Sequence, residues 1–169
     1  MLEAPCTALM FKLGRKMTQQ EFLQHFNKLY GYDFSTNCPY NFVHLPWSTL
    51  AIVNFLDEEA CAACWLRTKK LMVTGKMKGV RRATHHGLES NLVDYLSRAK
   101  GSDRIAKTRP LVFDRGIWIS LAQACHMLGP DLCTPPNFRQ IHLDLHSMSQ
   151  TEAWHYLEQM TGTQILIDL

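Results

Sequence analysis

The chain has 169 residues, of which 46% are hydrophobic and 20% are charged, as in a globular protein with one domain of ordinary size or a small domain with an extension. No apolar run approaches the ~20 residues of a membrane-spanning helix, and the first residues, MLEAPCTALMFKLG, lack the basic start of a signal peptide. We therefore expect no membrane partner, a location in the nucleus or the cytoplasm, and reduced thiols at the six cysteines.

The net charge of +3 conceals one strongly basic segment. Residues 67–109 contain twelve lysines and arginines and three acids, a net charge of +9, whereas the rest of the chain sums to −6. A basic segment on an acidic body is typical of a surface that binds phosphate, and a basic run is equally typical of a solvated, lysine-rich loop. Charge alone leaves both interpretations open.

Residues 7–36 predict a strand, a helix and a second strand. The segment TALMFKL at 7–13 alternates weakly as a strand does, and Thr18-Gln-Gln-Glu21 is a capping box that opens a helix. Gly31 ends this helix, and YDFST at 32–36 favours the second strand. The apolar face of the helix is expected to consist of Phe22, Leu23, Phe26, Leu29 and Tyr30.

Residues 37–84 add a loop, a third strand, a second helix and a fourth strand. NCPYNFVHLPW at 37–47 contains two prolines and favours a loop, whereas STLAIVNF at 48–55 is rich in β-forming residues. Asp57 caps the helix, and a strand follows near 80–84. The order β-α-β-β-α-β predicts an α+β fold, a ferredoxin-like sandwich with a four-stranded antiparallel sheet and two helices on one face. The buried side of the second helix is expected to carry Ala60, Cys61, Cys64 and Trp65.

An appended third helix is predicted at 87–97, and a polar basic linker follows it. The short apolar segment PLVF at 110–113 is expected to return to the body of the domain. We divide the chain into an N-terminal tail at 1–6, a domain at 7–113 and an acidic C-terminal extension at 114–169. The inward face of the third helix is expected to carry Leu88, Leu92, Tyr95 and Leu96.

The C-terminal extension predicts further regular structure. IWISLAQACHML at 117–128 favours a short helix that Gly129-Pro130 stops. Beyond it, the segments at 141–145, 149–160 and 164–169 predict a strand, a helix and a strand, so we expect a β-α-β extension.

Several segments, taken in order, carry a resemblance to one family. They are TALMFKLGRKMTQQEFL, YDF, LAIVNF, HHGLESNLVDYL and RPLVF. Together they resemble the C-terminal RNA recognition motif of the Mei-two-like RNA-binding proteins, over residues 7–113, about two thirds of the chain. The basic GRKMTQ loop, the helix around HGLESNL and the terminal RPLVF distinguish this family from a generic motif. The resemblance implies a non-catalytic domain that binds single-stranded RNA without a cofactor.

The third strand departs from the usual RNA-binding octamer, K/R-G-F/Y-G/A-F-V-x-F/Y. Ala51, Val53 and Phe55 fit this pattern, but Leu50 and Ile52 stand where it has its stacking aromatics. Stacking contributes about 1–3 kcal/mol per base, so losing two platforms forfeits roughly 2–6 kcal/mol of binding free energy. We therefore expect mainly electrostatic contacts, modest affinity and low sequence specificity.

Strand alternation predicts which side chains face away from the two helices. The apolar contacts to RNA are expected from Met10, Leu50 and Ile52, with Asn54 on the same open face. The electrostatic contacts are expected from Lys12, Arg15, Lys16, Lys78, Arg81 and Arg82. An apolar face of this kind must be covered or must bind a partner, so the alternative is a protein-interaction module that has lost RNA binding. The third helix or the acidic extension are the candidate covers.

Other clusters of reactive residues favour structural roles. Cys61 and Cys64 form a CxxC within a predicted helix, which favours buried core thiols. His85 and His86 are expected to be a solvated pair near the basic face. The spacing of Cys125, His126 and Cys133 matches no recognised zinc motif. No nucleophile elbow, P-loop or dinucleotide fingerprint is present, so we expect no enzyme, no metal and no cofactor.

Overall fold

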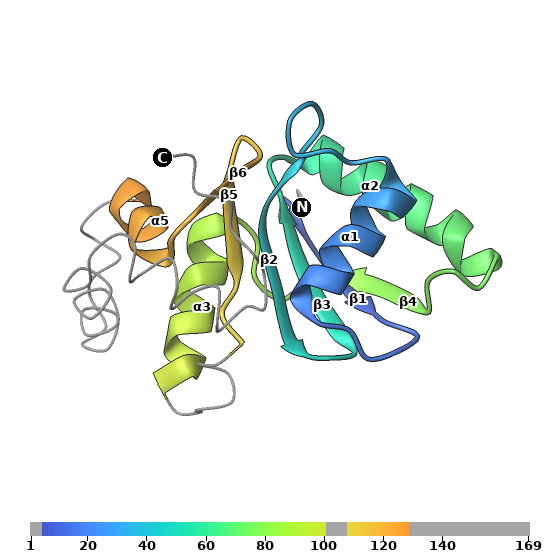
Figure 1. Ribbon diagram of the computed structural model, residues 1–169, viewed down its shortest axis with the longest axis horizontal. Coiled ribbons are helices and arrows are strands. Elements are labelled where there is room, and N and C mark those ends of the chain that lie inside the picture. The colour runs from blue at the N-terminus through green and yellow to red at the C-terminus, as the bar shows by residue number, and fades with distance from the viewer. Residues whose placement is uncertain (1–4, 101–107, 129–169) are drawn as a thin grey trace.

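The computed structural model describes residues 5–100 and 108–128, which form an α+β structure with a six-stranded antiparallel sheet and four helices (Figure 1). The sheet order is β4-β1-β3-β2-β5-β6. The strands are β1 (Ala8–Lys12), β2 (Tyr40–Trp47), β3 (Leu50–Phe55), β4 (Gly79–Arg82), β5 (Leu111–Asp114) and β6 (Ile117–Ile119). The helices are α1 (Gln19–Tyr30), α2 (Glu58–Val73), α3 (Leu88–Lys100) and α5 (Leu121–Leu128).

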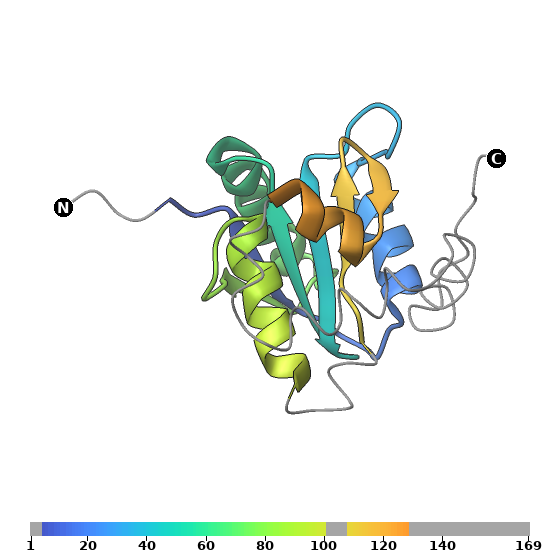
Figure 2. The ribbon, with the colours of Figure 1, turned by 90° about the vertical axis from the view of Figure 1, so that its left-hand side faces the viewer.

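Helices cover both faces of the sheet. In Figures 1 and 2, α1 and α2 lie on one side, and α3 and α5 lie on the other. The larger core is between the sheet and the first pair, where Phe11, Val53 and Phe55 from the sheet meet Phe22 and Phe26 from α1. The smaller core lies beneath α3 and α5. The predicted sandwich had two helices on one face of the sheet and one appended helix. In the structure α3 and α5 form a second helical layer on the opposite face, and this layer determines how much of that face stays open.

Local signals in the sequence explain most element boundaries. Thr18 and Glu21 exchange both hydrogen bonds of a capping box at the start of α1, and Gly31 ends the helix with φ 70°. Asp57 accepts a hydrogen bond from the Ala60 N–H at the start of α2. These predictions are confirmed. Cys61 and Cys64 are also buried as expected, and burial raises the pKa of both thiols to about 12.

The predicted second strand was placed wrongly. Residues 32–36 include a tight turn, in which the Asp33 carboxylate accepts a hydrogen bond from the Ser35 N–H. The real strand is β2, within the segment that was expected to be a loop. Pro46 is tolerated there because it lies where the register of β2 with β3 shifts, between His44 and Trp47, and prolines in sheets are found at such irregularities.

The segment 117–128 is a strand followed by a helix, where a single helix was predicted. Arg115 and Gly116 both have positive φ, at 49° and 81°, which is the geometry of a type I′ hairpin between β5 and β6. A Cβ on Gly116 would lie 1.9 Å from the Phe34 carbonyl oxygen, so only glycine fits. Ser120 and Gln123 then form a second capping box at the start of α5. The predicted β-α-β at 141–169 lies outside the described residues, and the boundary at 113/114 stays a prediction.

Helix α3 is held on the sheet by an apolar cluster. Leu92, Tyr95 and Leu96 of α3 are at most 4% exposed and pack in one cluster with Phe42 of β2 and Val112 of β5. Leu121, Ala124 and Cys125 of α5 complete the cluster. The predicted inward residues of the third helix are therefore confirmed, with Leu88 partly buried.

A hydrogen-bond network fixes the start of α3. Asn54 is 1% exposed, and its Oδ1 accepts from the Gly87 N–H and the Thr7 hydroxyl, both at 2.9 Å. Its Nδ2 donates to Asn41 Oδ1 and to the Phe55 carbonyl. Asn54 therefore lies on the expected face, but it is buried beneath the 85–87 turn. The prediction that Asn54 is available to RNA is wrong for this reason.

The network yields a stability prediction. Asn54→Ala would remove the four hydrogen bonds of one buried side chain, although the Gly87 N–H would keep the Thr7 hydroxyl as acceptor. Each hydrogen bond lost costs about 0.5–1.5 kcal/mol. We expect the free energy of unfolding, measured by urea denaturation, to fall by at least about 1 kcal/mol. Gln24→Ala, at an exposed position of α1, is the matched control and should change stability by less than about 0.5 kcal/mol. Equal stability of the two variants would contradict the role given to Asn54.

Candidate functional site

The register of the central strands defines which side chains share the second face of the sheet. Residues directly opposite one another in antiparallel strands lie on the same side. One row runs across β2, β3, β1 and β4 as Trp47, Leu50, Lys12 and Gly79. The next row is His44, Ile52, Met10 and Arg81. These two rows contain the predicted open-face residues Met10, Lys12, Leu50 and Ile52.

Helix α3 covers only part of this face. His44 is 5% exposed and its ring lies 5.2 Å from that of Tyr95, and Ile52 packs against the same cluster. Toward β1 and β4 the face is uncovered, and it forms a groove of about 470 Å³. We call this groove the open half. Its principal lining residues are Met10, Lys12, Trp47, Leu50 and Arg81.

The open half combines one exposed aromatic with two cations. Trp47 is 55% exposed at the end of β2, and it lies in the same row as Lys12. Arg81 is exposed, and its guanidinium rests on Met10, with Nε and Nη2 at 3.2 and 3.0 Å from Sδ. Within residues 5–100 and 108–128, no acid lines the groove. An indole and two cations on opposite sides of a partly apolar floor are suited to a ligand that has both planar rings and negative charges.

Trp47 was missed by sequence reasoning because its segment was taken for a loop. Its signal was the row of aromatic and β-branched residues in YNFVHLPW, which is typical of a strand. The strand pairs directly with β3, so its last residue reaches the open half. Trp47 therefore supplies an aromatic surface one strand away from the positions where Leu50 and Ile52 replace the usual aromatics.

The other predicted basic residues are dispersed. Arg15 and Lys16 are exposed in the loop between β1 and α1, and Lys78 is exposed just before β4. Arg82 pairs with Leu9 and therefore faces the side of α1 and α2, opposite to Arg81. The structure thus brings Lys12 and Arg81 together with Met10 and Leu50, and it does not place Arg82 with them.

A second, smaller cavity of about 220 Å³ continues from the open half beneath α3. Met10, Leu50 and Ile52 form its apolar side, and Pro46 and Trp47 also line it. Its α3 side carries Asn91, Asp94 and Arg98, and residues 83–85 complete the lining. Asp94 is the only acid among the described residues that line these two cavities.

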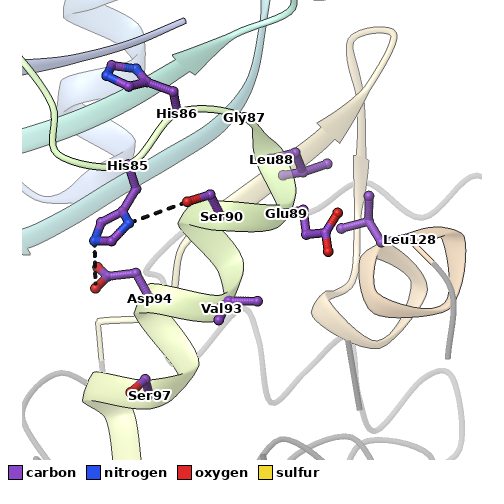
Figure 3. A pocket seen from close by; sticks show the side chains of 10 residues that line it. All are labelled: His85, His86, Gly87, Leu88, Glu89, Ser90, Val93, Asp94, Ser97 and Leu128. Carbon is purple, nitrogen blue, oxygen red and sulfur yellow. Dashed lines mark hydrogen bonds and ion pairs between the residues drawn. The ribbon is translucent and has the colours of Figure 1, made fainter. Parts of the chain in front are cut away.

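The turn before α3 is tied to the helix by His85 (Figure 3). Its Nε2 lies 3.1 Å from Asp94 Oδ1, and its Nδ1 lies 3.3 Å from Ser90 Oγ. Arg98 Nε also binds Asp94 Oδ1, at 3.0 Å. We interpret this Ser90–His85–Asp94 arrangement as structural, because Arg98 shares the carboxylate oxygen and because all the groups link the turn to its own helix. An open hollow of about 760 Å³ lies on this outer side of α3.

His86 connects the same turn to β1. Its Nδ1 accepts hydrogen bonds from the N–H groups of Thr7 and Ala8, at 3.3 and 3.1 Å. Both histidines of the pair are half-buried and bonded, so the prediction of a solvated pair is wrong. In residues 5–100 and 108–128, no three His, Cys, Asp or Glu side chains converge as metal ligands. Nor does any helix of that part of the chain combine the length and apolar character needed to cross a membrane.

His86 gives a prediction on pH. Burial, with Arg82 and His85 as nearby charges, lowers the pKa of His86 from 6.5. The unfolded chain then binds more protons, so this contribution to stability is complete above pH 6.5 and is lost as the pH falls through the lowered value. His86→Asn keeps an acceptor near Nδ1 but does not titrate. We expect its melting temperature to fall less on acidification than that of the wild type.

The control for this experiment is His126→Asn, which removes an exposed histidine from α5. Melting temperatures of the three proteins are compared across a pH series. If the melting temperatures of the wild type and His86→Asn fell by the same amount with pH, the result would contradict the assignment of a neutral His86 that accepts hydrogen bonds.

Comparison with known proteins does not identify this chain with a family. No family model, no curated protein and no solved structure matches it. Its function is therefore inferred from the residues and the geometry of the two cavities.

Proposed function

We propose that this protein is a non-catalytic binding domain for single-stranded RNA, and that the RNA lies across the open half. The observation that carries the proposal is one uncovered groove of the sheet that is lined by the exposed indole of Trp47 at one end and by Lys12 and Arg81 on β1 and β4. A base stacks on Trp47, and neighbouring phosphates lie against the two cations. Met10 and Leu50 provide the apolar floor between them.

The topology supports this function. The first six elements follow the order β-α-β-β-α-β, and the strand order β4-β1-β3-β2 leaves β1 and β3 in the centre of that unit. An RNA recognition motif uses the same arrangement, and it stacks bases on side chains of its sheet. We therefore propose that residues 7–113 adopt this motif, extended at β2 by the β5–β6 hairpin.

Single-stranded RNA fits the open half better than a duplex does. A sheet surface can accept bases that are splayed out and unstacked, whereas the bases of a duplex are stacked and paired. One platform supplies about 1–3 kcal/mol of binding free energy, and the cations add a salt-dependent contribution. These two contributions predict modest affinity for RNA. The stacking contribution depends on Trp47, and the electrostatic contribution depends on the salt concentration.

The stacking part is tested with Trp47→Ala. Fluorescence anisotropy with a random single-stranded RNA pool, at low and at physiological salt, should show an affinity about 5-fold to 150-fold weaker than that of the wild type. The dependence of affinity on salt should be unchanged, because no phosphate contact is lost. Leu66→Ala, which truncates a 64% exposed side chain on α2, is the control and should bind as the wild type does.

The electrostatic part is tested with the double variant Lys12→Ala/Arg81→Ala. Each lost phosphate contact lowers the slope of log affinity against log salt by about 0.7 for a single strand. The control Lys28→Ala/Lys70→Ala removes two exposed cations from α1 and α2 and should keep the wild-type slope. Absence of RNA binding by the wild type at low salt would contradict the proposed function. The cavities would then be candidates for docking a protein.

A further inference from the structure

The cavity beneath α3 has the size and the lining of a site for one planar ring system. Its volume of about 220 Å³ is below the ~300–1,000 Å³ of pockets for drug-sized ligands. Met10, Leu50 and Ile52 offer apolar side chains for the face of a ring. Trp47 lines both this cavity and the open half, so a chain stacked on its indole is already at the entrance.

The α3 side of the cavity offers hydrogen-bonding groups to the edge of such a ring. Asn91 uses its Nδ2 to donate to the carbonyls of His85 and Gly87, which leaves Oδ1 as its acceptor within the described part of the chain. Among the described residues, both partners of the Asp94 carboxylate bind Oδ1, which leaves Oδ2 as an acceptor. Arg98 adds a guanidinium that is joined to Asp94 through Nε alone. The wall therefore presents two acceptors and one donor.

The bases differ in how well they match this pattern. Guanine has two adjacent donors on its pairing edge, N1–H and the N2 amine, next to the acceptor O6. Two neighbouring acceptors can bind both donors at once, and a guanidinium beside them reaches O6. Adenine and cytosine offer one donor group next to an acceptor nitrogen. Uracil has a single N–H between two carbonyls, and a carboxylate repels the oxygen atoms of these carbonyls.

We infer that the cavity beneath α3 is a guanine-selective subsite, in which Asp94 Oδ2 accepts from N1–H, Asn91 Oδ1 accepts from the N2 amine and Arg98 donates to O6. This inference rests on the proposed function, because the base arrives as part of a single-stranded RNA bound on the open half. It also assigns α3 a second role. The helix that covers part of the sheet provides polar groups that recognise a base, which the aliphatic side chains of Leu50 and Ile52 cannot do.

The test uses three labelled RNAs with the wild-type chain. They are oligouridine, the same oligomer with one central guanosine, and the same oligomer with inosine at that position. Guanosine should raise the affinity about 5-fold to 150-fold over uridine, because a bidentate pair discriminates by about 1–3 kcal/mol. Inosine lacks the N2 amine and should fall between the two. Equal affinities for guanosine and inosine, or for guanosine and uridine, would overturn the inference.

The protein side of the test is Asp94→Asn. This variant should lose the preference for guanosine and still bind oligouridine, because Trp47, Lys12 and Arg81 are intact. Glu89→Gln removes one negative charge from an exposed position of the same helix, outside the cavity, and should keep the preference. A preference retained by Asp94→Asn would overturn the inference. If Asp94→Asn does not melt cooperatively, the inosine comparison in the wild type decides.

Failure of the subsite and failure of the proposed function give different results. A wild type that binds all three RNAs equally retains the proposed function without the subsite. A wild type that binds none of them at low salt contradicts both.

Discussion

The docking of α3 on the sheet is the interaction on which the rest of the structure depends. Leu92, Tyr95 and Leu96 bury their side chains against β2 and β5, while Asn54 binds the backbone of Gly87 where the turn meets the helix. A buried amide of this kind is costly unless its hydrogen bonds are made, so the helix has one position in which both the apolar cluster and the network are satisfied. That position divides the second face into a covered part and the open half.

The division moves the candidate ligand contacts away from the centre of the sheet. With Asn54 and His44 buried and Ile52 packed against the second cluster, the accessible groups are Met10, Lys12, Leu50 and Arg81 on β1, β3 and β4, with Trp47 at the end of β2. The aliphatic residues at the usual stacking positions then have a physical explanation. Ile52 packs beneath a helix and Leu50 forms a floor. Under the proposed function, an aromatic side chain is then needed only where the surface is exposed, at Trp47.

The same helix shapes the chemistry of the cavity beside it. Asp94 would be an unfavourable residue near a polyanion if its charge were isolated. Arg98 and His85 both lie within hydrogen-bonding distance of its Oδ1, so the local charge is balanced and one oxygen stays available. In the open half, by contrast, the cations are not paired with acids among the lining residues. The proposed site thus separates groups suited to phosphates from groups suited to a base edge.

Much of the fold followed from local signals, and the misplaced parts depended on tertiary contacts. Thr18 with Glu21, Gly31 and Asp57 act within one or two turns of their helices, so α1 and α2 could be predicted. Strand β2 could not, because Pro46 is acceptable only at an irregularity of the sheet, and the register shift between His44 and Trp47 depends on how β2 pairs with β3. The hairpin at Arg115-Gly116 depends likewise on the approach of Phe34.

The candidate site was predictable to a similar extent. Alternation correctly placed Met10, Lys12, Leu50 and Ile52 on one face, because period two is a property of any strand. The burial of Asn54 and the partial burial of Ile52 depended on where α3 docks, which the pattern of its apolar residues does not specify. Trp47 and Asp94 reach the cavities from elements whose positions only the assembled sheet defines.

The most direct test of the central claim uses the tryptophan side chains as reporters in a titration followed by NMR. The chain has four tryptophans, and each indole N–H gives its own signal in a nitrogen-labelled sample. Trp47 lies in the open half, whereas Trp65 packs on α2 against the other core. Addition of single-stranded RNA should move the Trp47 signal and leave that of Trp65 in place. A shift of Trp65 with an unmoved Trp47 would contradict the claim that the open half is the binding surface.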